Sequence, residues 1–480
     1  MRFTLVLLCS LTVSTLFAQK KTAFSSDPLA GIDTLLERIL KERKGAGFAV
    51  AVVNQNKILY AKGFGYRDYE KKLPVTPNTL FAIGSCSKAF TSLLIGLLQK
   101  DGKVEYDKPV RDYLPELKFF NNEMNNNVTL RDMMSHRTGL PRHDYSSYLF
   151  NTSSRDSMLQ RIQYQEPTAP LRQRWQYNNF MFLAQASVAE KLSGQSWEKN
   201  IKEKILVPLG MTSSNVSIEE LKQSAEPSLG YTVYKDSIIK KTDYYDINAM
   251  SPAGSINSSV TDMAKWVMCW INGGKVNGKE VFPAVYMKEA MSSQMITSAA
   301  LPTKERQDVF ISNYGFGWFL ASYRGHYRVE HGGNIDGFSA STCFFPSDSL
   351  GIIVLSNQNA SGIPALVRNI ISDRWLKLTP IDWNKRANDA EEKARKAAAE
   401  GKGKKEAAKY AHNVYDEKTH SATSTILTEV MTLDPKECPG MLYFMPCPKS
   451  PHGCDVDPTG SYIVGSGKLA AVIPVFSFDK

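Results

Sequence analysis

The most constraining feature of this sequence is the stretch FAIGSCSKAFTSLLIGLLQKDG, residues 81–102. From position 89 onward its apolar residues recur at the three- and four-residue spacing of a buried helix face. Gly102 follows, and glycine commonly ends a helix. The residues SCSK place Ser85 and Lys88 three positions apart, on one face of the first helical turn. The stretch therefore predicts a buried helix that begins with a hydroxyl beside an amine.

The pairing of Ser85 with Lys88 is typical of a nucleophile with its base. A serine hydroxyl reacts slowly at neutral pH unless a base lies within hydrogen-bonding reach. Lys88 can act as that base where burial and a neighbouring positive charge favour its neutral form. The same residues are also compatible with a helix N-cap followed by an exposed lysine, so the rest of the chain decides the interpretation.

The first 18 residues have the pattern of a secretory signal peptide. Arg2 precedes an apolar run, and Ala18 supplies a small residue at the expected cleavage position. No later run has the roughly 20 apolar residues of a membrane-spanning helix, so we expect no transmembrane segment in the mature chain. The expected location is outside the cytoplasm, either periplasmic or secreted.

Composition argues against a nucleic-acid-binding protein. The formal net charge is +10, and part of the excess lies in residues 393–409, which are typical of a solvated helical linker. Cys86, Cys269 and Cys343 lie in apolar surroundings typical of buried side chains. Three cysteines of the tail can form one disulfide in an oxidising compartment, with the pairing open: Cys438, Cys447 and Cys454. Their spacing matches no zinc pattern, and we predict neither a metal site nor a cofactor.

Sequence patterning predicts an α+β fold. An amphipathic helix over residues 30–44 precedes two strands, 47–53 and 57–65, joined by a polar turn. Residues 313–357 change to a strand pattern, which we expect to form adjacent antiparallel strands. Further helices are expected at 128–137, 180–192, 197–205 behind Ser196, from Ser259 onward, and at 363–376. The combination predicts an antiparallel sheet flanked by helices, with an additional mostly helical region.

Composition also divides the chain into parts. After the signal peptide, residues 30–378 carry most of the predicted elements and form the expected core domain. Residues 379–412 are rich in Lys, Ala and Glu, which indicates a linker. Residues 413–480 form a short C-terminal appendage near the lower size limit for an independent core, and we assign no function to it.

Two further motifs contribute groups suited to chemistry. The sequence RWQYNNFMF places Tyr177 and Asn179 two positions apart just before a helix, where both can face a cleft. The sequence RVEHGGNIDGF places His331, Gly332 and Gly333 on a strand. The absence of side chains at the two glycines allows a substrate to lie against that strand, although a β-bulge also explains them.

These motifs together resemble the serine hydrolase family of class C β-lactamases, penicillin-binding D,D-peptidases, esterases and D-aminopeptidase-like enzymes. The resemblance covers about residues 45–375, with SCSK, TLRDMMSHRTGLP, YNN, ILVPLGM, AGSINSSVTDMAKW, YGFGW and HGG in the family's order. It implies a β-lactamase/D,D-peptidase-like fold with Ser85 as the acylated nucleophile and Lys88 as its base. It further implies that Tyr177 transfers a proton to the leaving group and helps activate water. Asn179 corresponds to the amide that orients the carbonyl of the substrate side chain.

The resemblance also indicates the oxyanion and substrate contacts. Acyl transfer needs two donors aimed at the developing oxyanion, and backbone amides suit this role because they need no reorganisation. We expect these donors to be the N–H groups of Ser85 and of Asn334, which follows the strand glycines. His331, Gly332 and Gly333 stand where the family usually has Lys-Thr-Gly. Since histidine is mostly neutral at pH 7, recognition of a substrate carboxylate should weaken.

The leading hypothesis is an exported serine hydrolase that forms an acyl-enzyme on Ser85. Its expected substrates are small esters, amides or peptides, as for esterases and D-aminopeptidase- or D,D-peptidase-like enzymes. One alternative is a true β-lactamase. Another is a non-catalytic penicillin-binding protein or cell-wall sensor on the same scaffold, whose ligands would be β-lactams or cell-wall fragments.

Two further expectations concern residues around the nucleophile. No acidic residue stands out as a base for deacylation, so water activation is assigned to Tyr177 and Lys88. His136 precedes a turn in SHRTGL, and we expect it to be structural, with its ring holding the backbone.

Overall fold

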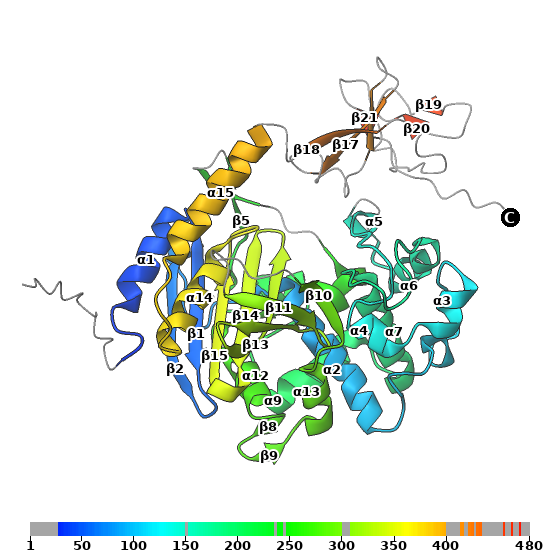
Figure 1. Cartoon of the computed structure of the whole chain (residues 1–480), viewed down its shortest axis with the longest axis horizontal. Coiled ribbons are helices and arrows are strands. Elements are labelled where there is room, and N and C mark those ends of the chain that lie inside the picture. The colour runs from blue at the N-terminus through cyan, green and yellow to red at the C-terminus, as the bar shows by residue number, and fades with distance from the viewer. Residues whose placement is uncertain are drawn as a thin grey trace, which may run out of the picture.

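The structure, a computed structural model, places the serine–lysine motif where a large sheet meets a group of helices (Figure 1). It describes residues 27–148, 152–234, 238–242, 246–299 and 308–399, together with short strands between residues 413 and 471. The predicted signal peptide, residues 1–18, lies outside the described residues, as do the three cysteines of the tail, Cys438, Cys447 and Cys454.

A nine-stranded antiparallel sheet forms the centre of the fold. Its strands lie in the order β10-β11-β12-β13-β14-β15-β1-β2-β3, and each pairs antiparallel with its neighbours. Their bounds are β1 Gly47–Val53, β2 Ile58–Asp68, β3 Leu73–Pro74, β10 Met295–Ala299, β11 Val309–Tyr314, β12 Phe319–Tyr323, β13 His326–Ile335, β14 Phe338–Phe345 and β15 Leu350–Ser356. The predicted run of adjacent antiparallel strands between residues 313 and 357 is therefore confirmed.

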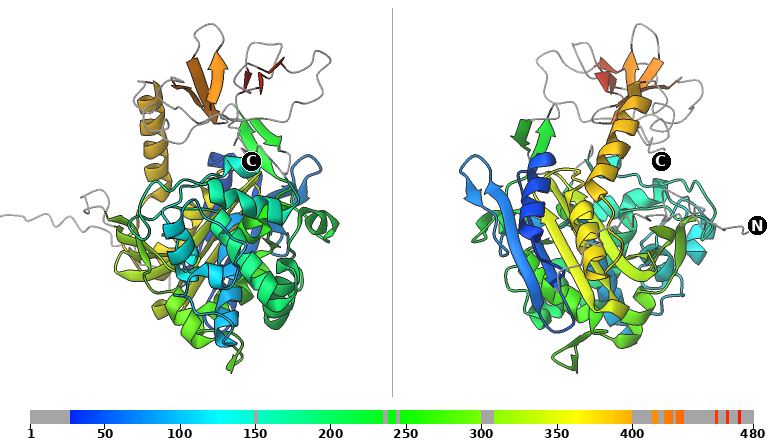
Figure 2. Two further views of the ribbon diagram at one scale, coloured as in Figure 1. Left: turned by 90° about the vertical axis from the view of Figure 1, so that its right-hand side faces the viewer. Right: turned by 60° about the vertical axis from the view of Figure 1, so that its left-hand side comes forward.

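Helices cover both faces of this sheet. Strands β1 and β15 are buried along their whole length, which explains why their sequences are almost entirely apolar. On one face α1 (Ile32–Glu42) and α14 (Ile363–Trp375) lie side by side, as the right-hand view of Figure 2 shows. On the other face α2 (Ser87–Lys100) and α12 (Val260–Ile271) belong to the larger apolar core. The prediction of a sheet flanked by helices is confirmed.

The helical region is built around α7 (Phe180–Ser193), which packs against α2. The shorter helices are α3 Asn122–Asn127, α4 Leu130–Met134, α5 Tyr145–Tyr148, α6 Arg155–Gln160, α8 Trp197–Ile201, α9 Val207–Leu209, α10 Ile218–Gln223, α11 Ser251–Gly254 and α13 Ala284–Ala290. Three small strand pairs accompany them: β4 Phe81–Ala82 with β7 Asn257–Ser258, β5 Tyr231–Tyr234 with β6 Ile238–Lys241, and β8 Lys275–Val276 with β9 Lys279–Glu280.

Two helices begin at the capping serines that the sequence indicates. The Ser196 hydroxyl accepts a hydrogen bond from the Lys199 backbone N–H at 3.2 Å, which starts α8. The Ser259 hydroxyl accepts one from the Asp262 N–H at 3.1 Å, which starts α12. Each contact satisfies one of the backbone donors that a helix leaves free at its first turn.

The helix predicted over residues 128–137 is shorter in the structure. Thr129 and Asp132 form a reciprocal capping box at its start. Helix α4 nevertheless ends at Met134, because His136 adopts a left-handed backbone angle, φ 56°, that an α-helix cannot continue through.

The region beyond residue 378 begins with a helix that packs on the core domain. Helix α15 spans Trp383–Ala399 within the predicted linker, residues 379–412. The Trp383 side chain is buried, and its indole N–H donates a hydrogen bond to Asp373 Oδ2 at 2.7 Å. At least the first turn of α15, which lies in the predicted linker, therefore packs against the core domain.

The C-terminal appendage contains short strands. They are β16 Asn413–Asp416, β17 Ser421–Ile426, β18 Glu429–Leu433, β19 Asp455–Val456, β20 Tyr462–Ile463 and β21 Ala470–Ala471, in one sheet of order β18-β17-β16-β21 and one pair β19-β20. Cys86, Cys269 and Cys343 are free and buried, as predicted. Within the ranges given above, no helix has both the length and the apolar character needed to cross a membrane.

Candidate active site

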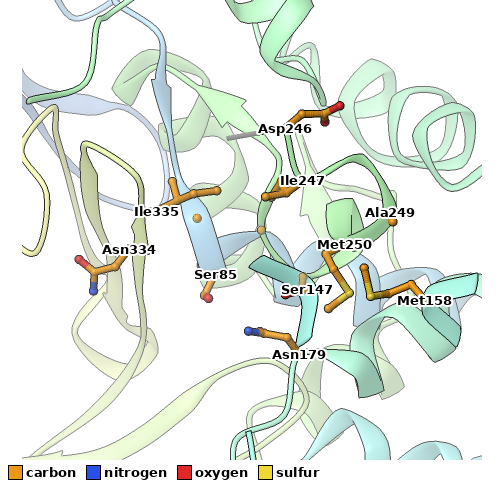
Figure 3. A pocket seen from close by; sticks show the side chains of 13 residues that line it. Ser85, Ser147, Met158, Asn179, Asp246, Ile247, Ala249, Met250, Asn334 and Ile335 are labelled. Atoms are coloured by element: carbon orange, nitrogen blue, oxygen red, sulfur yellow. The ribbon is translucent and has the colours of Figure 1, made fainter. Parts of the chain in front are cut away.

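Ser85 lies in a 3-10 turn, Gly84–Cys86, that leads into α2, and it lines a pocket between the sheet and the helical region (Figure 3). Gly84 has a φ of +51°, a backbone conformation that favours glycine. A Cβ at this position would lie 2.9 Å from the backbone nitrogen of Asn334. The turn therefore needs a residue without a side chain to bring Ser85 close to strand β13.

Lys88 provides a buried amine beside the nucleophile. Its Nζ lies 3.0 Å from Ser85 Oγ and donates a hydrogen bond to the Ala253 carbonyl oxygen at 2.8 Å. Burial lowers the pKa of Lys88 well below its ordinary value. The negative charge of Asp144 opposes this pKa shift, whereas the positive charge of Arg142 adds to it. An amine with a lowered pKa can accept the proton of Ser85, which is the role predicted for it.

Tyr177 completes a group of three around the nucleophile. The tyrosine is 9% exposed, and its ring centroid lies 4.7 Å from Lys88 Nζ. Burial raises the pKa of Tyr177 above its ordinary value, and a side-chain hydrogen bond with Ser85 opposes that shift. The phenol is thus protonated at neutral pH and can donate a proton to a leaving group near Ser85.

Asn179 lines the same pocket, but its amide donor is already engaged. Its Nδ2 donates a hydrogen bond to Asp144 Oδ1 at 2.8 Å, and Asp144 Oδ2 accepts one from Arg142 Nε at 2.7 Å. The Arg142 guanidinium in turn lies 4.6 Å from the centroid of the Tyr177 ring. Sequence reasoning missed Asp144 and Arg142, because their contacts join a loop to a helix 35 residues later and leave no local pattern.

His331 lies within β13 with its side chain buried, and it is not among the residues that line the pocket. It is 2% exposed; its Nδ1 donates to the Gly332 carbonyl oxygen at 2.6 Å, and its Nε2 accepts a hydrogen bond from the Tyr314 hydroxyl at 2.8 Å. Burial and the nearby charge of Lys88 lower the pKa of His331 to about 3. The ring is therefore neutral at pH 7, as expected from the sequence, while both of its nitrogens are already bonded within the protein.

The second half of β13 forms a free edge next to Ser85. Strand β12 pairs only with His326–Glu330, so within the described ranges no strand pairs with residues 331–335 on that side. A Cβ at Gly333 would lie 1.9 Å from the Ile83 carbonyl oxygen and 3.1 Å from the Ser85 nitrogen. The backbones of β13 and of the nucleophile's turn are therefore in direct contact. This brings together the amides of Ser85 and Asn334, the two predicted oxyanion donors.

Replacing Gly333 by alanine is expected to lower both stability and activity. The added methyl group would overlap the Ile83 carbonyl oxygen, so the strand and the Ser85 turn must move apart. Overpacking of this kind costs about 1–3 kcal/mol of folding free energy, and misplaced oxyanion donors lower kcat by about a hundredfold. Thermal melting and steady-state kinetics measure the two effects.

Gly332→Ala is the matched control for this prediction. The nearest atom to a Cβ at position 332 is the Ala340 carbonyl oxygen, 3.6 Å away, which is an ordinary van der Waals distance. We expect this variant to keep near-native stability. Equal losses of stability in the two alanine variants would contradict the role assigned to the contact at Gly333.

The pocket in front of Ser85 has an empty volume of about 650 Å³, open solvent at its mouth included, and a wall of mixed apolar and polar character. Apolar side chains come from Met158, Ile247, Met250 and Ile335, and polar ones from Ser147, Asn179 and Asp246. Within the described part of the chain, the residues that line the pocket include one carboxylate and no Lys or Arg. Over the described parts of the chain, no group of three or more His, Cys, Asp and Glu side chains is arranged to hold a metal ion.

Known proteins resemble this chain in sequence and in fold. The family model described as Beta-lactamase matches residues 32–370. Unguisins hydrolase ungD' of Aspergillus campestris is 32% identical over 401 residues, which cover 78% of this chain and 72% of that protein. The octameric penicillin-binding protein homologue of Pyrococcus abyssi has a similar structure, with a TM-score of 0.65, 23% identity, and coverage of 84% of this chain and 86% of that chain. D-amino acid amidase of Ochrobactrum anthropi SV3 follows with a TM-score of 0.58, 19% identity, and coverage of 72% and 98%.

Proposed function

This chain belongs to the Beta-lactamase family of serine hydrolases, and we propose that it is an exported enzyme that cleaves ester or small amide and peptide bonds through an acyl-enzyme on Ser85. The observation that carries the proposal is the fully buried Lys88 amine, 3.0 Å from a pocket-lining serine hydroxyl. Burying an ordinary ammonium group is costly, whereas a buried amine of lowered pKa is what a serine nucleophile needs.

In the acylation step, Ser85 Oγ attacks the substrate carbonyl carbon while its proton passes to Lys88 Nζ. The N–H groups of Ser85 and Asn334 stabilise the oxyanion that forms. When the tetrahedral intermediate collapses, the C–O or C–N bond breaks and the leaving group takes the Tyr177 phenolic proton. Lys88 then returns its additional proton to Tyr177, so both side chains regain their starting states.

Deacylation follows the same route in reverse with water in place of the leaving group. One water proton passes through Tyr177 to Lys88 as the water oxygen attacks the ester carbonyl carbon. Collapse of this second intermediate releases Ser85, which takes its proton back from Lys88. The products are the free acid and the original enzyme.

The charges of the pocket support substrates without a carboxylate beside the scissile bond. Among the described residues that line the pocket there is Asp246 but no Lys or Arg, and His331 is buried and neutral. A carboxylate entering this space would lose its hydration without gaining a cationic partner from the pocket lining. The name of the unguisins hydrolase supports a hydrolytic reaction, and that of the D-amino acid amidase supports cleavage of an amide bond.

Export is the remaining part of the proposal. It is supported by the charged start, apolar run and small residue of the first 18 positions. N-terminal sequencing of the mature protein tests it. We expect the mature chain to begin at Gln19, and an intact N-terminus on the functional protein would contradict export by this route.

A substrate panel tests the proposed activity. We expect Ser85-dependent hydrolysis of p-nitrophenyl butyrate and of D-alanine p-nitroanilide, with benzylpenicillin hydrolysed at least about a hundredfold more slowly. That factor corresponds to about 2.7 kcal/mol of lost transition-state stabilisation. Fast penicillin turnover would instead identify a β-lactamase. A stable penicillin adduct without turnover of any substrate would identify a sensor, and either result would overturn the proposal.

A further inference from the structure

His136 lies directly against Tyr177 in the interior of the protein. The residue is fully buried, and the centroid of its ring lies 4.3 Å from that of Tyr177. Phe182 and Tyr314 enclose the same imidazole, with ring centroids at 5.1 and 4.9 Å. His136 also has the left-handed backbone angle that ends α4, an unusual conformation for a residue with a side chain.

Two hydrogen bonds connect His136 to the residues on either side of Tyr177. Its carbonyl oxygen accepts a hydrogen bond from the Gln176 backbone N–H at 2.8 Å. Its Nδ1 accepts one from the Asn178 backbone N–H at 3.1 Å. The backbone is therefore fixed immediately before and immediately after Tyr177. Both hydrogen bonds depend on the backbone and side-chain conformation of His136.

The second hydrogen bond requires a neutral ring. Because Nδ1 accepts a hydrogen bond from the Asn178 N–H, the proton of the neutral imidazole is on Nε2. A proton on Nδ1 would make that nitrogen a donor and break the hydrogen bond. Burial lowers the pKa of His136 well below its ordinary value, and the positive charge of the nearby Arg142 lowers this pKa further. The neutral acceptor is thus maintained at physiological pH.

We propose that His136 is a positioning residue for Tyr177, which holds the tyrosine so that its phenol can transfer a proton to the leaving group. This inference rests on the proposed function. His136 reaches Tyr177 through the backbone at 176 and 178 and through ring packing, and it does not line the pocket at Ser85. Its loss should therefore impair protonation of the leaving group more than the attack by Ser85.

The test compares two esters that share an acyl group. The p-nitrophenolate of p-nitrophenyl butyrate leaves without a proton, whereas the alkoxide of ethyl butyrate must be protonated as it leaves. We expect His136→Phe, which keeps a ring without the acceptor, to reduce kcat/KM for ethyl butyrate at least about tenfold more than for the nitrophenyl ester, because small misplacements of a catalytic group are costly. The comparison uses kcat/KM because it reports acylation, whereas deacylation of the butyryl-enzyme is common to both esters.

Two further variants separate the acceptor from the backbone conformation. Asparagine tolerates left-handed angles and carries a side-chain oxygen, so His136→Asn should keep the ratio of the two kcat/KM values within about threefold of that of the native protein. His136→Gly tolerates the angle but lacks an acceptor, and should show the same selective loss as His136→Phe. Thermal melting of each variant identifies any that is not folded.

The outcomes distinguish this inference from the proposed function. Equal losses for both esters in His136→Phe and His136→Gly would show a merely structural role and overturn the inference. Tyr177→Phe serves as the reference, since it should be selectively impaired on ethyl butyrate. If Tyr177→Phe shows no such selectivity, the proton relay of the proposed function fails as well.

Discussion

Replacing Ser85 by alanine is expected to lower kcat by at least about a thousandfold, to the level left by binding and oxyanion contacts alone. The hydroxyl forms the acyl bond, and the nearest other hydroxyl of the trio, on Tyr177, is held by burial in its protonated form. The variant should fold normally, because the Ser85 hydroxyl hydrogen-bonds Lys88 and Tyr177 at the pocket and is not part of the apolar core. Steady-state hydrolysis of p-nitrophenyl butyrate measures the effect.

Ser92→Ala is a matched control on the same helix. Ser92 is buried in α2 and hydrogen-bonds Gln185 at 3.2 Å, away from the pocket. Its replacement removes a serine hydroxyl from α2 without touching the proposed chemistry, so kcat should stay near the native value. Comparable activity in Ser85→Ala and the native enzyme would remove Ser85 from the mechanism.

Replacing Lys88 by methionine is expected to lower kcat/KM by at least about a hundredfold, the usual scale for loss of a general base. Methionine has a similar length and suits the fully buried position, so the folded structure should be retained. Without the amine, Ser85 loses the proton acceptor 3.0 Å away. Lys88→Arg should be similarly inactive, because arginine does not release its proton at accessible pH.

The pH dependence of the native enzyme provides a second test of Lys88. Burial lowers its pKa well below the ordinary value, so the neutral amine is more abundant at neutral pH than for an exposed lysine. The reactive form is the deprotonated one. Accordingly, kcat/KM should fall as the pH drops through this lowered pKa, and the acid limb should be absent from any residual activity of Lys88→Met. An unchanged profile in that variant would assign the base to another group.

The elements of the fold that depend on local pattern could be predicted from the sequence. Strands β1 and β15 are apolar because both of their faces are buried, and helices α8 and α12 begin at Ser196 and Ser259, whose hydroxyls cap them. The end of α4 could not be predicted, since it depends on the left-handed angle of His136. That angle is stabilised by contacts with residues about 40 positions later, which no local pattern reports.

The candidate site also has features that the sequence predicts and features that only the fold reveals. Ser85 and Lys88 meet because they are three positions apart on one helix, which the sequence shows directly. The Ala253 carbonyl oxygen that holds the amine is 165 residues away, and Asp144 approaches Asn179 only through the fold. The environment of His331 on β13 likewise depends on the fold. Its hydrogen-bond partner Tyr314 belongs to β11, which lies on the other side of β12 in the sheet. Sequence spacing thus identifies the reacting groups, and the fold determines which of them face the substrate.

The most direct test of the central claim is to trap the acyl-enzyme. The protein is mixed with p-nitrophenyl butyrate, quenched with acid during turnover, and examined by intact mass and peptide mapping beside Ser85→Ala. We predict one added butyryl group, located on Ser85 and absent from the variant. A butyryl group on another residue, or full turnover with no covalent species at any quench time, would contradict acyl transfer through Ser85.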